Sequence, residues 1–224
     1  LARPILSSTD KKAQWWETLT EYKSIVYWDK AKTLGAPFVM FYNAGGRHPE
    51  TNLKGERVGI ALSKDMKKWK RYAGNPVFTH EAEGIITGDA HIQRMGDLYV
   101  MFYFSAFDPS RPYKAFNTFA VSRDLVHWTE WTGPDLITPS KEYDNLFAHK
   151  SYVVKHNDVV YHFYCAVKKN DQRGIAVATS RPMGRSAVHF PTADTKQRRE
   201  ETELKEGWRT QLCSTNGEVS TSNG

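Results

Sequence analysis

Two residues of types that perform acid–base chemistry, Asp89 and His149, lie 60 positions apart. A carboxylate can act as a general base, and an imidazole can act as a general acid where a neighbouring carboxylate holds its pKa near the working pH. Asp89 could be that neighbour, could be the base itself, or could bind the substrate. The structural alternatives are a turn-closing role for Asp89 and a hydrogen-bonded packing role for His149. The chain segments that carry Asp89 and His149 help to decide between a functional and a structural role for the two residues.

These elements repeat along the chain. Three aromatic runs, "VMFYNA", "VMFYFSA" and "YHFYCAV", begin at Val39, Val100 and Tyr161, at intervals of 61 residues. A leading strand-like segment precedes each run and an apolar partner segment follows it. The leading segments are residues 22–28, 89–95 and 149–156, and the partner segments are residues 57–63, 117–122 and 173–180. The residues at 95–97 and 156–158 predict tight hairpins between leading segment and aromatic run.

The first two repeats share the element Ser-x-Asp-x-x-x-Trp, at residues 63–69 and 122–128. Its aspartates are expected to close a turn by accepting backbone N–H groups, and its tryptophans are expected to pack between repeats. Residues 75–78 and 134–137 are expected to form short outer strands. No long segment has helical periodicity, and residues 11–19 are the best short candidate. A repeat of roughly 40–60 residues with about four strands predicts an all-β fold, a β-propeller of four-stranded antiparallel blades.

Composition argues against several other classes of protein. The 224 residues carry a net charge of +6, but the basic clusters at 64–71 and 196–199 accompany no nucleic-acid-binding motif, which favours solvated surface lysines over a nucleic-acid partner. No apolar run is long enough for a membrane span, and the first residues show no signal-peptide pattern. Neither zinc-ligand spacing nor a Gly-rich phosphate loop is present, so no cofactor is expected, with a structural calcium left open.

Two segments, "GIALSKDMKKWKRYAGNPVF" and "FAVSRDLVHWTEW", resemble blade signatures of the five-bladed β-propeller glycosidases. This superfamily includes glycoside hydrolase families 32, 43, 62, 68, 117 and 130, and the resemblance covers residues 15–185. It implies catalytic groups on the innermost strands, around the central axis. The corresponding positions here are residues 22–24, 88–90 and 149–151.

The resemblance also implies which residues form the site. Families 32 and 43 use carboxylates, but this chain lacks their Arg-Asp-Pro and Glu-Cys motifs and has no Glu-Gly-Pro at the third leading segment. His149 stands there instead, and family 117 is similar in using a histidine as the acid. The expected catalytic residues are Asp89, His149 and Glu21, and the expected substrate-binding residues are Lys150, His91, Lys23, Glu17 and Trp28. Either Glu17 or Glu21 could supply a second carboxylate, while capping or packing is the alternative for Lys150, His91 and Trp28.

The resulting functional expectation is a glycoside hydrolase that cleaves a plant or algal oligosaccharide, with inversion. The alternatives are a non-catalytic carbohydrate-binding propeller and a glycoside phosphorylase. Residues 1–185 are expected to form the propeller domain, either whole or lacking an N-terminal blade, and open blade edges would invite self-association. Residues 186–224 read as a charged tail or the start of a further domain, since "RREETELKEGW" resembles a strand of a family 2 glycosidase. A secreted or periplasmic location is compatible with the resemblance.

Overall fold

The computed structural model describes residues 3–80 and 83–181, which form three antiparallel sheets. The predicted tail, residues 186–224, lies outside the described residues, as does the predicted boundary at residue 185. The first sheet contains β1 (Thr20–Trp28), β2 (Phe38–Arg47), β3 (Lys54–Ser63) and β4 (Lys70–Arg71). The second contains β5 (Ile86–Met95), β6 (Leu98–Ala106), β7 (Ala115–Ser122) and β8 (Thr129–Glu130). The third contains β9 (Phe147–His156), β10 (Val159–Val167) and β11 (Arg173–Thr179).

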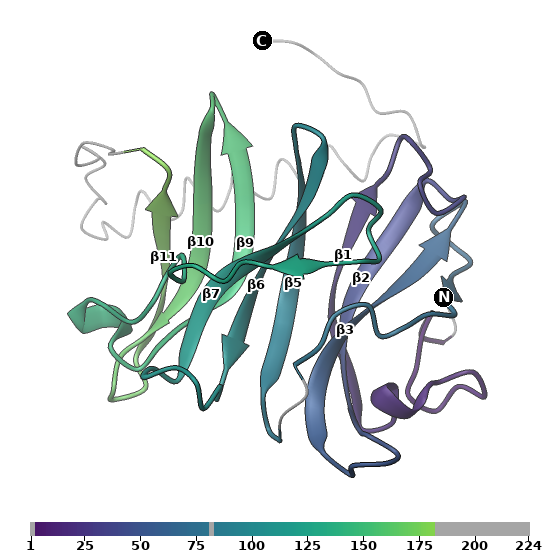
Figure 1. Ribbon diagram of the computed structural model, residues 1–224, viewed down its shortest axis with the longest axis horizontal. Helices are drawn as coiled ribbons and strands as arrows, with labels where there is room; N and C mark the ends of the chain where they lie inside the picture. The colour runs from purple at the N-terminus through teal and green to yellow at the C-terminus, as the bar shows by residue number, and fades with distance from the viewer. Residues whose placement is uncertain (1–2, 81–82, 182–224) are drawn as a thin grey trace, which may run out of the picture. The chain divides into compact units, whose positions relative to one another are not determined.

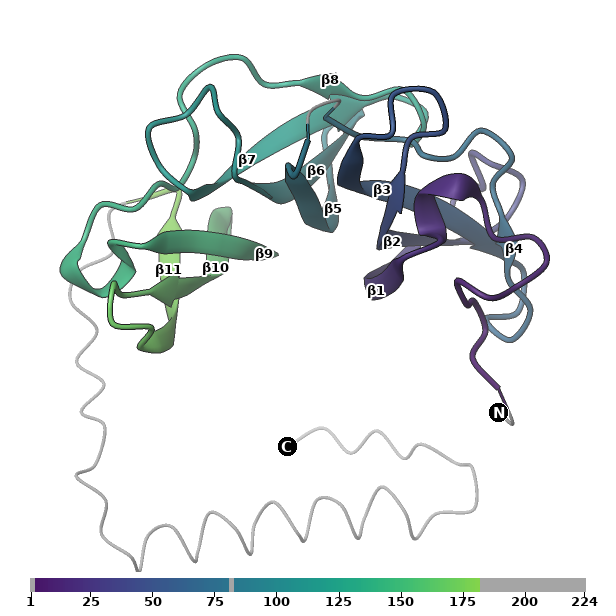
Figure 2. The ribbon, with the colours of Figure 1, turned by 90° about the horizontal axis from the view of Figure 1, so that it is seen from below.

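Each sheet follows the chain order, so each is a meander whose leading strand lies at one edge. The second sheet lies between the other two, and β1, β5 and β9 are the inner edges, on the side away from β4 and β8 (Figures 1 and 2). Two short 3₁₀ turns, η1 (Trp15–Glu17) and η2 (Glu142–Asp144), are the helical elements of the described residues. The all-β prediction is thereby confirmed, with four-stranded blades in the first two sheets and three strands in the described part of the third. Within this part of the chain, no helix has the length and apolar character that a membrane span requires.

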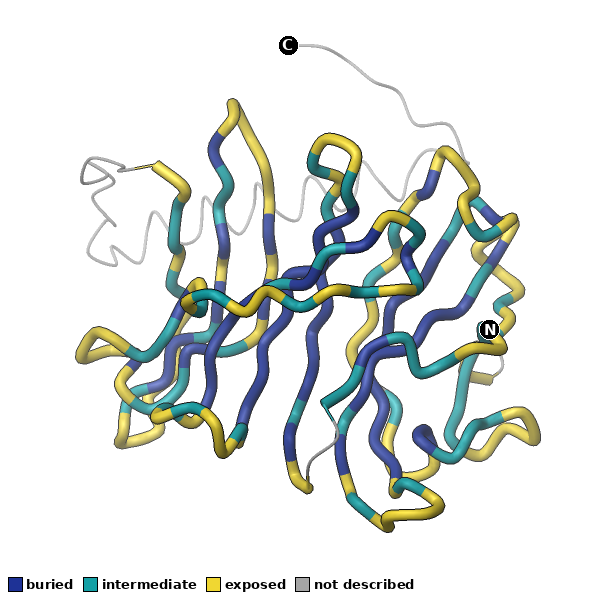
Figure 3. Tube along the Cα trace, viewed as in Figure 1, coloured by how far each residue is buried: buried dark blue, intermediate teal, exposed yellow. Residues whose placement is uncertain are grey.

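The middle strand of the second sheet, β6, is buried on both faces because the first sheet packs on one face and the third sheet on the other. Along β6, Met101 and Tyr103 pack toward the first sheet, in a cluster with Phe41, Ile60 and Ile92. Alternate residues of the same strand, Val100 and Phe102, pack instead with Val153 of β9. The buried colour runs along these central strands in Figure 3, while exposed residues gather at the turns. This two-sided packing fixes the side-chain direction along β6.

The Ser-x-Asp-x-x-x-Trp element closes a turn in both copies, as its sequence predicted. Asp65 Oδ1 accepts the N–H groups of Lys67 and Lys68 at 2.9 Å, and Asp124 Oδ1 accepts two N–H groups in the same way at 3.0 and 2.8 Å. Trp128 packs against the cluster between the first and second sheets, with its ring 6.0 Å from that of Phe41, whereas Trp69 packs against the other face of the first sheet. The inter-sheet packing prediction therefore holds for Trp128.

Two sequence predictions need correction. The outer strands are β4 and β8, which directly follow the tryptophan turns. Residues 75–78 and 134–137, predicted as outer strands, make only the isolated bridges Val58↔Phe78 and Asn117↔Ile137. The helix considered at residues 11–19 is a single 3₁₀ turn, because Trp16 is drawn into the core and is 0% exposed. The two predicted hairpins are present, and their turns use positive φ angles at Gly96 (61°), Asn157 (47°) and Asp158 (57°).

The ring of Trp16 packs against Gly59 of β3 and leaves no room there for a side chain. A Cβ added at Gly59 would lie 2.2 Å from the Trp16 ring, whereas a Cβ added at Gly55 of the same strand meets nothing closer than 3.6 Å. We expect Gly59→Ala to lower the free energy of unfolding by about 1–3 kcal/mol through overpacking. Gly55→Ala is the matched control and should unfold like the parent in a urea titration. Equal unfolding of the two variants would contradict the assigned contact.

Two buried histidines lie where the second and third sheets meet. His91 of β5 is 7% exposed, and its Nδ1 accepts the N–H of Val153 in β9. His162 of β10 is 5% exposed, and its Nε2 is 3.1 Å from Ser151 Oγ. Burial lowers the pKa of each imidazole to about 4, because the charged form would lose its hydration.

These shifts predict acid-sensitive stability. The histidines titrate near pH 6.5 in the unfolded chain but near 4 when folded, so below about pH 6.5 the unfolded chain binds more protons. Stability is therefore full above that pH and is lost as the pH falls toward 4. We expect roughly 1–2 kcal/mol of lost unfolding free energy per histidine between about pH 7 and about pH 5.

The His91→Asn/His162→Asn double variant should show a smaller loss over this pH interval in urea unfolding than the parent does. His156→Asn, at an exposed residue, is the control and should keep the parent's pH dependence. If the double variant keeps it as well, the two buried histidines are not its source.

Candidate functional site

Each of the three inner strands carries a β-bulge near its start. In β1 the register shifts between Tyr22 and Ser24, in β5 it shifts between Gly88 and His91, and in β9 it shifts between His149 and Ser151. At each bulge one non-glycine residue has a positive φ angle: Lys23 (46°), Asp89 (55°) and Lys150 (63°). Such bulges re-aim a side chain out of the regular alternation and are frequent beside active sites. Here three equivalent bulges present one charged side chain each.

The three re-aimed side chains meet. Lys23 Nζ lies 2.6 Å and Lys150 Nζ lies 3.6 Å from the same oxygen, Asp89 Oδ2. The Asp89 side chain is 2% exposed, while those of the two lysines are 44% and 45% exposed. A buried carboxylate needs such partners, because an unpaired charge away from water is strongly unfavourable. We call Lys23, Asp89 and Lys150 the Asp89 site.

A buried amide holds the central bulge in place. Asn43 Oδ1 accepts the Asp89 N–H at 3.0 Å, and Asn43 Nδ2 donates to the Thr87 carbonyl oxygen at 3.3 Å. Position 88 has no room for a side chain, since a Cβ there would lie 2.2 Å from Asn43 Nδ2. Sequence reasoning missed Asn43. Its signal was a polar residue in the middle of the apolar run "VMFYNA", where a buried amide must have partners.

His149 lies next to the site but is not the structural counterpart of Asp89. That counterpart is Lys150, one residue further on. The His149 ring stacks on Phe147 at 5.4 Å and meets Phe104 edge-on at 5.6 Å, while Lys150 Nζ lies 5.7 Å from the Phe104 ring centre. Burial, reinforced by the charges of Lys150 and Arg173, lowers the pKa of His149 to about 4. Its buried Nε2 makes no hydrogen bond within the described residues.

The aromatic side chains around His149 continue outward. Phe107, which is 52% exposed, lies 6.4 Å from the Phe147 ring. Phe107, Phe147, His149 and Phe104 thus form an aromatic row from the surface to Lys150. Sequence reasoning did not single out these phenylalanines, because their neighbours in the same runs are equally aromatic core residues.

The other predicted site residues lie in different contacts. Glu17 Oε1 accepts hydrogen bonds from Tyr42 Oη and Arg71 Nε, and Glu21 Oε1 accepts one from Arg71 Nη2 at 2.7 Å. Burial raises the pKa of Glu21. Trp28 is 62% exposed and lies five residues beyond Lys23 on β1, roughly 17 Å at the rise of an extended strand. His91 joins β5 to β9, as described above. Catalytic or substrate-binding roles for these four residues stay predictions.

Within the part of the chain that the structure describes, no group of three or more His, Cys, Asp or Glu side chains is placed to hold a metal ion. The chemistry that the Asp89 site itself offers is that of one carboxylate with two ammonium donors. The carboxylate can accept a proton or a hydroxyl hydrogen bond, and the ammonium groups can donate to hydroxyl, carboxylate or phosphate oxygens.

Comparison with solved structures finds two highly similar proteins. One, described as a complex of BT0996 with RGII, is 79% identical over 87% of this chain with a TM-score of 0.80, and another, named "Glycoside hydrolase", is 78% identical with the same coverage and TM-score. This chain spans 55% of the length of each. A beta-1,2-mannobiose phosphorylase from Listeria innocua matches 75% of this chain and 44% of its own length, at 15% identity and a TM-score of 0.55, which shows a shared fold.

No protein-family model matches the chain, and no curated protein matches it. The structural matches nevertheless share the fold described above. They confirm the resemblance drawn from the sequence: this chain is similar over most of its length to a protein named "Glycoside hydrolase", and its fold is that of the β-propeller glycoside hydrolases.

Proposed function

We propose that the chain carries part or all of the reaction centre of a glycoside hydrolase that cleaves a plant or algal oligosaccharide, with Asp89 as its essential carboxylate. The observation that carries this proposal is the convergence of three bulged inner strands on one buried carboxylate. The descriptions of the two similar structures, a glycoside hydrolase and an RGII complex, support the choice of activity and of an oligosaccharide as the ligand.

Glycoside hydrolysis with inversion needs one group to activate a water and another to protonate the leaving oxygen. Its ion pair with Lys23 suits Asp89 to the first role. Lys150, at 3.6 Å from the same oxygen, is the more loosely held of the two lysines and has a half-exposed side chain. We assign it the binding of a substrate hydroxyl or carboxylate.

His149 is the proposed partner, and its environment limits when it can act. With a pKa of about 4 the imidazole carries a second proton only in acidic solution, so His149 could be a general acid only there. Its Nε2 is buried and makes no hydrogen bond within the described residues, so a sugar hydroxyl would reach it only after the surrounding side chains move. Phe147 and Phe107 of the aromatic row offer apolar ring faces beside it, against which the C–H face of a sugar ring can pack.

A phosphorylase is the second candidate, because two lysines converge on the site. Phosphate needs cationic donors, and both ammonium groups lie within 3.6 Å of the same Asp89 oxygen. Their pairing with Asp89 counts against this candidate, since phosphate would have to compete with a buried carboxylate. A phosphorylase would release a sugar 1-phosphate only when inorganic phosphate is present.

Asp89→Asn tests the proposal, since the amide keeps the shape of the side chain and removes its basicity. We expect hydrolysis to fall by at least about 100-fold, in the range that general acid–base groups contribute. Asp97→Asn, in the turn between β5 and β6, is the matched control, because this aspartate pairs with Arg123 at the surface. Reducing ends released from a panel of plant and algal oligosaccharides give the rate, and circular dichroism checks the fold.

The same assay separates the alternatives. Unchanged hydrolysis by a folded Asp89→Asn variant would refute the site. Sugar binding without hydrolysis by the parent would indicate a carbohydrate-binding propeller, and a product that forms only with phosphate would indicate a phosphorylase. Proton NMR of the first-formed anomer tests inversion directly.

A further inference from the structure

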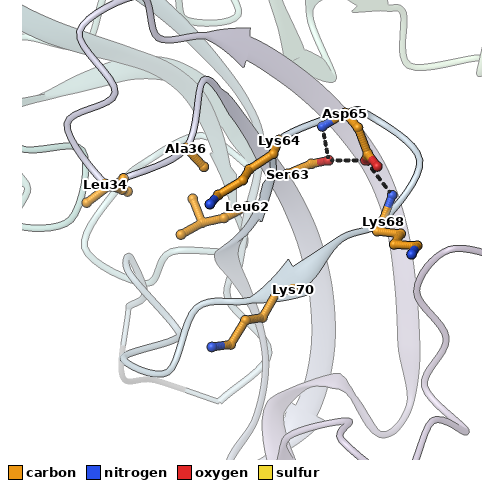
Figure 4. A pocket seen from close by; sticks show the side chains of 9 residues that line it. Leu34, Ala36, Leu62, Ser63, Lys64, Asp65, Lys68 and Lys70 are labelled. Atoms are coloured by element: carbon orange, nitrogen blue, oxygen red, sulfur yellow. Dashed lines mark hydrogen bonds between the residues drawn. The ribbon is translucent and has the colours of Figure 1, made fainter.

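A second concave surface lies between the loop that joins β1 to β2 and the turn that joins β3 to β4, and it shares no residue with the Asp89 site. Leu34, Gly35, Ala36, Leu62 and Ser63 line a pocket of about 410 Å³, together with Lys64, Asp65, Lys68 and Lys70. Its volume falls within the roughly 300–1,000 Å³ typical of small-molecule sites. In Figure 4 the side chains of Lys64 and Lys70 extend to the same side as Leu62, which lies between them. We call this the lysine pocket.

The three lysines of the lysine pocket outnumber its one acid, Asp65. Within residues 3–80 and 83–181, no carboxylate forms an ion pair with Lys64, Lys68 or Lys70. The one acid in the lining, Asp65, is occupied by the turn: its Oδ1 accepts the N–H groups of Lys67 and Lys68 and the Ser63 hydroxyl. The ammonium groups of Lys64 and Lys70 therefore flank the apolar floor and remain available to an anion, while Lys68 extends to the other side of the turn (Figure 4).

The second sheet contains a natural comparison, because it has its own copy of the same turn. Ser63, Asp65 and Trp69 correspond to Ser122, Asp124 and Trp128, with the same hydrogen bonds and with positive φ at Met66 (58°) and Leu125 (69°). The basic residues differ. The positions of Lys67, Lys68 and Lys70 hold Val126, His127 and Thr129 in the second copy.

Arg123, which corresponds to Lys64, is already paired with Asp97. The turn therefore folds without unpaired lysines, and fold stability does not explain their presence in the first copy. A cluster of unpaired like charges is unfavourable in itself, which leaves ligand binding as the use that the geometry supports.

We propose that the lysine pocket binds an acidic oligosaccharide, with the ammonium groups of Lys64 and Lys70 contacting its carboxylate groups, the Leu34–Leu62 floor contacting the C–H face of a sugar ring, and Lys68 adding positive charge at the rim. The choice of a sugar rather than another polyanion rests on the proposed function. Ammonium groups are suited to carboxylate or sulfate oxygens as point charges, and the exposed setting makes the binding sensitive to salt. This second site would hold a charged chain on the protein independently of Asp89.

The test uses the chain with Asp89→Asn, so that substrate is not consumed, and hexagalacturonate as the probe. Isothermal titration gives the affinity, and amide NMR shifts of residues 63–70 report whether the probe contacts this pocket. Lys64→Gln/Lys68→Gln/Lys70→Thr should weaken binding by at least about tenfold and abolish those shifts, an effect corresponding to about 1.4 kcal/mol. A sulfated hexasaccharide, run in parallel, shows which anionic group the pocket prefers, and a neutral xylohexaose should not shift these amides.

The matched control is Lys32→Gln/Lys114→Gln/Lys169→Gln, which removes the same charge at three scattered exposed lysines. Binding within about twofold of the parent is expected for this control, since general screening by salt leaves only local charge effective. Equal losses in the two triple variants, no saturable binding by the parent, or tighter binding of a single-stranded oligonucleotide than of the acidic sugar would each overturn the proposal. Retained hydrolysis by Asp89→Asn would instead overturn the proposed function and leave the result for the lysine pocket readable through the amide shifts.

Discussion

The ion pairs of Asp89 are the interaction on which the arrangement of the inner strands depends. A carboxylate that is 2% exposed is stable only with cationic or hydrogen-bonding partners, and here two cations come from the two neighbouring sheets: Lys23 from β1 and Lys150 from β9. Asn43 of β2 accepts the backbone N–H of Asp89 and so holds the bulge that carries the carboxylate. Each sheet must therefore hold its inner strand in one register. The positive φ angles at the three bulges add of order 1–3 kcal/mol of strain each, and the stacked apolar faces of β2, β6 and β10 offset it.

The fold was largely predictable because it repeats. Three runs at a 61-residue interval predicted the middle strands, and the two tryptophan turns predicted where the hairpins return. The outer strands were misplaced, because β4 and β8 have two residues each and leave no periodic pattern to read. Sequence patterns report burial over several residues, so very short strands escape them.

The sequence predicted the central carboxylate of the candidate site, Asp89, but not the residues that surround it. Asp89 stood out as a lone carboxylate at the head of a leading strand, but its counterpart was expected to be His149 and is Lys150 by position. The reason is the bulge: one inserted residue reverses which side chain faces which way, and nothing in the local sequence marks that insertion. The pairing of Glu17 and Glu21 with Arg71 was equally hidden, since it joins residues at least 50 positions apart across a whole sheet.

The internal repeat also separates what the fold requires from what it leaves free. The serine, aspartate and tryptophan of the turn keep the same hydrogen bonds in both copies, so they belong to the architecture. The bulges at the inner strands keep their backbone geometry while their side chains alternate between lysine, aspartate and lysine, so the backbone belongs to the fold and the charges to the site. By the same reasoning, Lys64, Lys68 and Lys70 of the first turn are not required by the fold, because the second turn forms without lysines at these positions. In a repeated protein, a position where the backbone is kept and the charge changes is therefore the place to look for function.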